Sequence, residues 1–260
     1  MKLAVVGAGK MGLAILKGAL DAGVLEPSEV GVLDRDREAT EERARALGVR
    51  PLLPEDLAEA ERILIAVKPQ HFPELASNLV GLEAGILSVM AGVRAQRIAE
   101  ALKTQRVVRA MPNLGVSVGL GTTALTALPE AEAAGDLAFA EALFSALGSA
   151  VRLPEPLFDA FTAMSSSALA YLAVAAEALA DGGVRMGLSR ELAERFAREA
   201  LAATARLLET RAPAELKNEV TSPGGTTAAG LYALEQGAFR AALIAAVEAA
   251  TQRGKELGES

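Results

Sequence analysis

The 260-residue sequence has no cysteine, no tryptophan and only one histidine, His71. The lack of cysteine excludes disulfides, thiolate nucleophiles and cysteine-based metal sites, and a single histidine excludes a histidine-rich site, so we expect no metal. Aromatic residues make up only 3% of the chain and hydrophobic residues 51%, so alanine and leucine must form most of the core. The net charge is −7 and no basic stretch occurs, which argues against a nucleic-acid surface.

The sequence also lacks the segments typical of secretion or membrane insertion. Met1 leads directly into an apolar run, with no charged leader region and no cleavage site. The longest charge-free stretch of the C-terminal half, residues 160–176, contains a threonine and three consecutive serines and is short for a bilayer span. We therefore expect a cytoplasmic protein that acts on a small molecule, without nucleic-acid or membrane partners.

In the first half of the chain, apolar strand-like runs alternate with helical patterns. Unbroken apolar runs separated by helices predict βαβ units and a doubly wound, mainly parallel α/β sheet, with right-handed crossovers that place helices on both faces. The predicted strands are residues 3–7, 30–33, 63–67, 86–90, 107–111, 122–128 and 150–153, and the predicted helices are residues 10–22, 35–47 and 132–147.

The pattern changes between Pro154 and Pro156, after which no strand pattern occurs. Residues 158–164, 167–181, 190–208 and 228–254 all have helical patterns, so we place a boundary at residue 152, followed by an all-helical domain over 153–260. Residues 168–180 are apolar on nearly every face, with Glu177 as the only charge. Such a helix needs neighbours on all sides, which favours a subunit interface over the central helix of a monomeric bundle.

A glycine-rich motif follows the first predicted strand and opens the first helix. In a G-x-G-x-x-G turn, the glycines allow a tight turn, a close approach of pyrophosphate to the backbone and close helix–strand packing, and the helix N-terminus attracts phosphate. Because the motif lies between a strand and a helix, we identify residues 1–152 as a dinucleotide-binding domain of the Rossmann type rather than a turn without a ligand. The motif comprises Gly7, Ala8, Gly9, Lys10, Met11 and Gly12.

Two adjacent residues at the end of the second predicted strand bear on the cofactor. An acid at this position, Asp34, would accept hydrogen bonds from ribose hydroxyls and favour NADH. Its neighbour, Arg35, would pair with a 2′-phosphate and favour NADPH. Both residues are present, so the motif alone does not decide between the two cofactors.

Two further motifs follow predicted strands, at the sheet edge where ligands bind in open α/β folds. Ala66, Val67, Lys68 and Pro69 end the third strand, and we expect them to contact the cofactor, although a Lys-Pro pair also suits an ordinary turn. Residues 109–113 (RAMPN) end the fifth strand, and Asn113 is expected to face the nicotinamide. His71 is interpreted as a surface residue and not as a catalytic acid.

The C-terminal half contains one loop with binding chemistry, residues 220–227 (VTSPGGTT), directly before a predicted helix. Pro-Gly-Gly requires a turn, and Thr226 or Thr227 is placed to cap the helix. Turn amides, hydroxyls and a helix N-terminus together suit a carboxylate, although an ordinary capped loop has the same pattern.

These motifs, in this order, resemble the pyrroline-5-carboxylate reductase family. The resemblance covers nearly the whole chain, and its most specific parts are DGGVRMGLSRELA at 181–193 and TSPGGTTAAGLYALEQGAFRAALIAAVEAATQRGKELG at 221–258. It implies hydride transfer from NADPH, with NADH possible, to the C=N bond of L-1-pyrroline-5-carboxylate, giving proline. It also implies that the helical domain carries substrate binding and interlocks two subunits, and that five dimers can form a decamer.

The resemblance assigns the substrate to the C-terminal loop. The substrate carboxylate would bind Ser222, Gly224, Gly225, Thr226 and Thr227, and Thr227 would also hydrogen-bond the ring nitrogen. The sequence departs from the family in two places: Ser166-Ser167-Ala168-Leu169 lacks the usual glycine and proline, and Leu114-Gly115 follows the MPN segment.

Two other functions fit the same two-domain plan. A β-hydroxyacid dehydrogenase or another imine reductase is one, but hydroxyacid enzymes commonly use a lysine on the central helix, and no lysine occurs between Lys103 and Lys217. A non-catalytic, nucleotide-binding regulator is the other, and only the altered segment at 166–169 supports it.

Overall fold

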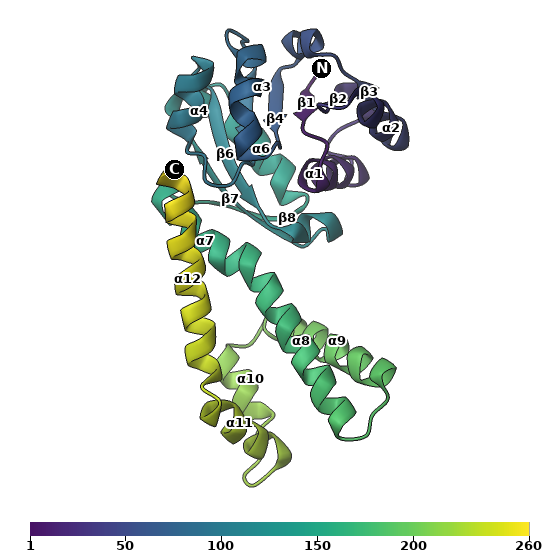
Figure 1. Ribbon diagram of the computed structural model, residues 1–260, viewed down its shortest axis with the longest axis vertical. Helices are drawn as coiled ribbons and strands as arrows, with labels where there is room; N and C mark the ends of the chain where they lie inside the picture. The colour runs from purple at the N-terminus through teal and green to yellow at the C-terminus, as the bar shows by residue number, and fades with distance from the viewer. Residues whose placement is uncertain (260) are drawn as a thin grey trace. The chain divides into compact units, whose positions relative to one another are not determined.

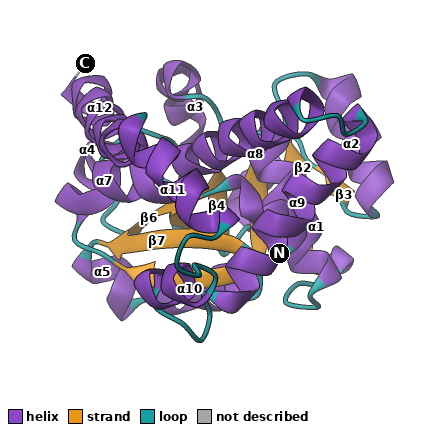
Figure 2. Cartoon of the chain, turned by 90° about the horizontal axis from the view of Figure 1, so that it is seen from below, coloured by secondary structure: helices purple, strands orange, loops and turns teal. Residues whose placement is uncertain are grey.

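The computed structural model describes residues 1–259 and contains two compact units. The first unit comprises residues 1–166 together with the chain from residue 251 onwards, and the second comprises Ser167–Ala250. The strands belong to the first unit, and the second contains only helices and their connections (Figure 1, Figure 2). The last strand ends at Arg152, where the helical part of the chain begins. Whether residue 152 is also a functional boundary stays a prediction.

A single eight-stranded sheet forms the centre of the first unit, in the order β3-β2-β1-β4-β5-β6-β7-β8. All neighbours pair in parallel except β6 and β7, which are antiparallel. The predicted doubly wound, mainly parallel sheet is therefore confirmed. The strands are β1 (Leu3–Val6), β2 (Val30–Leu33), β3 (Arg50–Pro51), β4 (Arg62–Ile65), β5 (Gly85–Ser88), β6 (Val107–Pro112), β7 (Gly121–Ala127) and β8 (Gly148–Arg152).

Helices cover both faces of this sheet because side chains alternate along each strand. On β1, Leu3 and Val5 pack into one apolar cluster with α1 and α6, whereas Ala4 and Val6 pack into a second cluster with α3 and α4. The helices of this unit are α1 (Lys10–Asp21), α2 (Arg37–Leu47), α3 (Phe72–Leu79), α4 (Ala95–Leu102), α5 (Pro129–Ala133), α6 (Asp136–Ser145) and α7 (Phe158–Thr162).

A buried ion cluster ties α6 to the sheet. Asp136, the first residue of α6, is fully buried, and its carboxylate accepts hydrogen bonds from Arg62 Nε and Arg106 Nε, both at 3.0 Å. Its hydrogen bond with Arg106 is also the main reason that the pKa of Arg106 is raised. A side chain on Gly85 would meet the Asp136 carboxylate at 2.5 Å, so glycine is required on the neighbouring strand.

The second unit leaves much of its apolar surface exposed. Its buried cluster contains only three alanines, Ala180, Ala193 and Ala197. Leu172 and Val174 on α8 are 51% and 63% exposed. Exposed apolar side chains are expected on a helix that packs against a second subunit, as the sequence predicted for this helix. The helices of this part of the chain are α8 (Ala168–Arg185), α9 (Arg190–Leu207), α10 (Pro213–Glu219), α11 (Thr226–Gln236) and α12 (Phe239–Glu259).

The stretch Glu155–Arg185, which includes α8, is long and apolar enough to cross a membrane by length and composition, with 11% of its apolar window buried. Two acids on α8, Glu177 and Asp181, interrupt that apolar surface.

Three of the predicted helix boundaries were wrong. The helix predicted over 228–254 is two helices, because the chain turns at Gly237 and Ala238, and Ala238 has φ +54°. The helix predicted over 132–147 is also two, because Gly135 has φ +79°. The helix predicted from residue 35 begins at Arg37, after Asp36 caps it by accepting hydrogen bonds from the amides of Glu38 and Ala39.

Candidate cofactor and substrate sites

The glycine-rich turn has the geometry that a bound pyrophosphate requires. Gly7 has φ +98°, and a Cβ there would lie 2.7 Å from the Ala66 carbonyl carbon. A Cβ on Gly12 would lie 2.2 Å from the Gly7 oxygen, so glycine lets α1 pack against the turn. A Cβ on Gly9 would meet no atom of the chain within 4 Å, which leaves open space in front of the α1 N-terminus. The turn therefore fits the phosphates of a dinucleotide.

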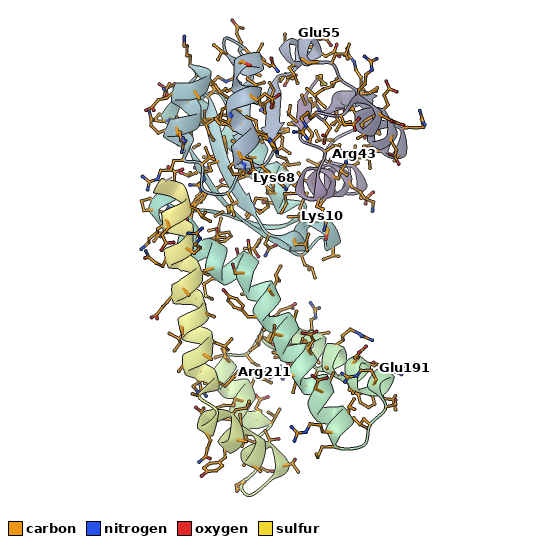
Figure 3. The ribbon with its side chains drawn as sticks, in the orientation of Figure 1. Lys10, Arg43, Glu55, Lys68, Glu191 and Arg211 are labelled. Carbon is orange, nitrogen blue, oxygen red and sulfur yellow. The ribbon has the colours of Figure 1, made fainter. Side chains whose placement is uncertain are left out.

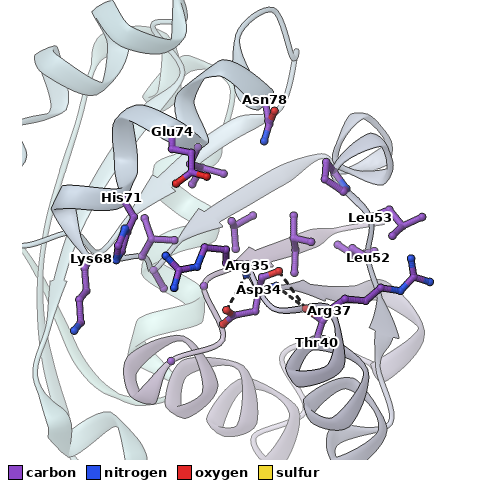
Figure 4. Close-up of a pocket in the computed structure, with 18 residues that line it drawn as sticks. Asp34, Arg35, Arg37, Thr40, Leu52, Leu53, Lys68, His71, Glu74 and Asn78 are labelled. Carbon is purple, nitrogen blue, oxygen red and sulfur yellow. Dashed lines mark hydrogen bonds between the residues drawn. The ribbon is translucent and has the colours of Figure 1, made fainter.

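A cavity of about 510 Å³ opens from this turn along the carboxyl ends of β1, β2 and β4 (Figure 4). Gly7 and Gly9 line its inner end, and Asp34 and Arg35 line the part after β2. Most of its lining surface is apolar. A cavity of this size, with apolar walls and charged groups such as Asp34, Arg35 and Lys68 at defined points, is typical of a cofactor site.

Asp34 is held by the protein itself at the end of β2. Its Oδ2 accepts hydrogen bonds from the Ala8 amide at 2.9 Å and from Arg43 Nη1 at 2.7 Å, and its Oδ1 accepts one from the Arg35 amide at 2.8 Å. The carboxylate thus fixes the glycine-rich turn, and Arg43 balances its charge. Among the described residues, no hydrogen bond or ion pair uses the Arg35 guanidinium, which lies in the cavity wall.

The segment after β4 lies beside the glycine-rich turn. β4 ends at Ile65, so Ala66 and Val67 form a connection next to Gly7, instead of the last strand residues that the sequence predicted. Ala66, Val67 and Lys68 line the cavity, and Pro69 begins the short 3-10 helix η3 (Pro69–His71). Figure 3 shows Lys10 at the start of α1 and Lys68 after β4, two cations at the same sheet edge. Neither ammonium group forms an ion pair among the described residues.

Asn113 lies at the end of β6, where its side chain is used within the fold. Its Oδ1 accepts hydrogen bonds from the amides of Gly115 at 3.0 Å and Thr122 at 3.1 Å, and its Nδ2 donates to the Ser165 carbonyl at 3.0 Å. The side chain is almost fully buried. Asn113 thereby connects β6 to the π-helical turn η6 (Ala163–Ser167), in which the Ser165 and Ser166 hydroxyls are buried and have no hydrogen-bond partner among the described residues.

The predicted substrate loop forms a compact turn in the second unit. Gly224 has φ +67°, and the Gly225 amide donates to the Ser222 carbonyl at 3.0 Å, which closes a turn with Pro223 at its second position. Gly225 is the N-cap of α11 through its backbone, so the expectation that a threonine caps this helix was wrong. Thr226 and Thr227 occupy the first turn instead, where helical amides have no intrahelical partner and attract anions.

Sequence reasoning missed the far wall of the cofactor cavity. His71, interpreted from the sequence as a surface residue and not a catalytic acid, is partly buried and lines the cavity. Leu75 and Asn78 on α3 line the same wall, and no helix was predicted at these positions. The spacing of these positions at 71, 75 and 78 is the helical signal that identifies one face.

Comparison with known proteins identifies the parts of the chain. Residues 2–92 match the family model described as NADP oxidoreductase, coenzyme F420-dependent, and residues 155–257 match the model described as pyrroline-5-carboxylate reductase dimerisation. The fold, the glycine-rich turn and these matches define a nicotinamide-dinucleotide-dependent oxidoreductase with a helical dimerisation domain.

Complete relatives make the assignment more specific. The chain is 60% identical over 260 residues to a pyrroline-5-carboxylate reductase of Thermus thermophilus, covering 100% of both chains, and 41% identical to one of Synechocystis, covering 100% of this chain and 99% of the relative. The pyrroline carboxylate reductase of Plasmodium falciparum, solved with NADP bound, superposes with a TM-score of 0.88 at 27% identity over 99% of this chain and 98% of that one. The chain therefore belongs to the pyrroline-5-carboxylate reductase family, and it uses NAD(P)H.

Proposed function

We propose that this protein reduces the C=N bond of L-1-pyrroline-5-carboxylate with NAD(P)H to give L-proline, the last step of proline synthesis. Full-length identity of 60% to a reductase of that name carries this proposal. When bound, the cofactor supplies a hydride, which adds to the imine carbon. A protonated imine is already electrophilic and needs no strong general acid, so positioning and electrostatics are the main tasks of the protein.

The cofactor residues have complementary roles in this proposal. The open space at Gly9, the amides of the first turn of α1 and the Lys10 ammonium bind the pyrophosphate. Asp34 fixes the turn through the Ala8 amide and faces the ribose. Ala66, Val67, Lys68 and Pro69 form the opposite side, and Met11 and Gly12 support the turn. Asn113 acts by holding the backbone after β6, because its own amide group is occupied within the fold.

NADPH is the proposed preferred cofactor. Arg43 balances the Asp34 carboxylate at 2.7 Å, so Asp34 repels a 2′-phosphate less than a free acid would. Arg35 and Arg37 line the same part of the cavity and offer two guanidinium groups to that phosphate. Parallel turnover assays with NADPH and NADH test this preference. A higher kcat/KM with NADH, retained in an Arg35→Ala variant, would contradict it.

The turn at 222–227 is the proposed substrate site. The Ser222 hydroxyl and the backbone of Gly224, Gly225 and Thr226 bind the substrate carboxylate at the α11 N-terminus. The Thr227 hydroxyl positions the ring nitrogen. This assignment rests on the turn geometry and on the polar, accessible character of the loop.

A threonine series tests the substrate site. Thr227→Ala is expected to lower kcat/KM for pyrroline-5-carboxylate by about 10²-fold, the effect of one lost positioning contact. Thr227→Ser keeps the hydroxyl and is expected to recover most of this loss. Thr204→Ala, the same change on the exposed surface of α9, is the matched control. An unchanged kcat/KM in Thr227→Ala would remove this residue from the site, and no turnover by the unmodified protein with either cofactor would refute the proposed function.

The dimerisation domain also supports a proposal on assembly. We propose that α8 packs against a second copy of the chain and that five such dimers form a decamer in the cytoplasm. The exposed leucine and valine side chains of α8 support the first step. Light scattering measures the mass directly, and fractionation of cells tests the location. A monomer at micromolar concentration would contradict both levels of assembly.

A further inference from the structure

The cofactor cavity continues past Asp34 and Arg35 into a region that the phosphate and ribose contacts leave unused. One wall is the connection after β3, with Leu52, Leu53 and Pro54. The other wall is a single face of α3 and the residue before it, formed by His71, Glu74, Leu75 and Asn78. These four positions follow the i, i+3, i+4, i+7 spacing of a helix face.

The order of the groups along the cavity indicates what this region binds. The glycine-rich turn suits the pyrophosphate, and Asp34 and Arg35 suit the adjoining ribose. The next group along the adenosine half of a dinucleotide is the adenine ring. Leu53 and Leu75 provide apolar surface on the two walls, which suits the faces of a planar ring.

Two polar side chains on the α3 wall, Glu74 and Asn78, have hydrogen-bonding groups that complement those on the edge of an adenine ring. Adenine carries an amino donor at C6 beside the N7 acceptor, and an asparagine amide can pair with both. A carboxylate is a pure acceptor and suits an exocyclic amino group. Figure 4 shows Glu74 and Asn78 on the α3 side of the cavity, with Arg35 across from them. Among the described residues, no ion pair engages the Glu74 carboxylate.

We propose that Glu74 accepts a hydrogen bond from the adenine amino group and that Asn78 assists on the same edge. The cofactor site therefore selects adenine dinucleotides over their 6-oxopurine analogues by hydrogen bonding. This inference concerns cofactor binding alone and does not depend on the identity of the reduced imine.

The alternative role for Glu74 is purely electrostatic. A carboxylate opposite Arg35 would weaken a 2′-phosphate contact and lower the affinity for NADPH relative to NADH. That role predicts no difference between an adenine and a hypoxanthine base. The two roles are separable because the base and the 2′-phosphate can be varied independently.

The experiment is isothermal titration of the complete protein with NADH, NADPH and reduced nicotinamide hypoxanthine dinucleotide, without substrate. Hypoxanthine has an oxygen in place of the amino group, so the Glu74 carboxylate would face an acceptor. The hypoxanthine analogue is expected to bind about 10- to 30-fold more weakly than NADH, the effect of one lost hydrogen bond to a charged group. In Glu74→Gln this ratio is expected to fall to about threefold or less, because an amide can also donate to the oxygen.

Two further variants complete the design. Asn78→Ala is expected to reduce the ratio partially, and Glu55→Gln, an exposed acid on the neighbouring 3-10 helix η2 (Pro54–Glu59) that does not line the cavity, is expected to leave it unchanged. Glu74, Asn78 and Glu55 are all exposed, so the fold should persist. Equal binding of both bases by the unmodified protein would overturn the proposal. An unchanged ratio of NADH to hypoxanthine-dinucleotide affinity in Glu74→Gln would also overturn it. The same holds if Glu74→Gln gains affinity for NADPH alone, or if Glu55→Gln changes the ratio as much as Glu74→Gln does.

Discussion

Two glycines of the same turn should respond differently to the same substitution. In Gly9→Ala the new methyl group meets nothing of the chain within 4 Å, so it occupies the space in front of α1. In Gly12→Ala it lies 2.2 Å from the Gly7 oxygen and 3.2 Å from the Ala66 side chain. The first change should therefore affect the ligand alone, and the second should affect both the ligand and the fold.

The expected magnitudes follow from these contacts. Relieving a 2.2 Å contact requires α1 to move by about 1 Å, and overpacking of this kind costs about 1–3 kcal/mol of the free energy of unfolding. Higher helix propensity returns up to about 1 kcal/mol in Gly12→Ala. Gly9 is the N-cap of α1, where alanine is poorer than glycine, so Gly9→Ala should lose less than about 1 kcal/mol. Its NADPH affinity should fall at least about 30-fold, or about 2 kcal/mol.

Urea unfolding and calorimetric titration with NADPH measure the two effects separately. Gly23→Ala, remote from the turn and also without neighbours within 4 Å, serves as a control for a glycine substitution that the ligand does not meet. It should be mildly destabilising, because Gly23 has φ +67°, but should bind NADPH normally. If Gly9→Ala is folded and binds NADPH as tightly as the unmodified protein, the pyrophosphate does not approach this turn and our assignment of the cavity is wrong.

Two further predictions concern the folded state. Asp136→Asn should lower the free energy of unfolding by about 3–5 kcal/mol, because it leaves two arginines facing a buried site without their counter-charge. The control Asp21→Asn, in an exposed pair with Lys17, should change the free energy of unfolding by less than about 0.5 kcal/mol. Equal urea midpoints for the two variants would refute this prediction. The pKa of Glu141 is lowered, mainly by its hydrogen bond with Arg152, so its stabilising effect is complete above the ordinary glutamate pKa of 4.5 and is lost as the pH falls through the lowered value. The difference in urea midpoint between the unmodified protein and Arg152→Gln should therefore disappear in acid, and a constant difference would contradict it.

The sequence was sufficient to predict the structure where a short motif determines the local backbone geometry. Gly7, Gly9 and Gly12 are explained by the turn, and the alternating apolar runs correctly predicted every strand of the sheet except the short β3, whereas α3 and α4 were not predicted. Most predicted strand boundaries agree to within two residues, because buried strands have a strong apolar signal. Strands β7 and β8 are the exceptions in direction, because both run antiparallel to the other six strands, but they do not change the class of the fold.

Features that depend on a distant partner were not predictable in the same way. The chain turns at Ala238 with φ +54°, although alanine is a strong helix former, and Gly237 was the one local sign of the break. The environment of Asn113 depends on Ser165, 52 residues later, and a motif at the strand end cannot reveal that contact. The cavity wall on α3 depends in the same way on the fold, which places α3 opposite the connection after β3.

The helical unit raises a different physical point, because its buried cluster of three alanines is too small to stabilise it alone. Its apolar residues are exposed on α8, in the part of the chain that matches a dimerisation domain. Association must therefore contribute much of the stability of this unit, and its stability depends on protomer concentration. The proposed substrate turn at 222–227 belongs to the same unit. Folding of that turn and assembly of the subunits are consequently linked, whereas the dinucleotide site is built on a sheet with its own core.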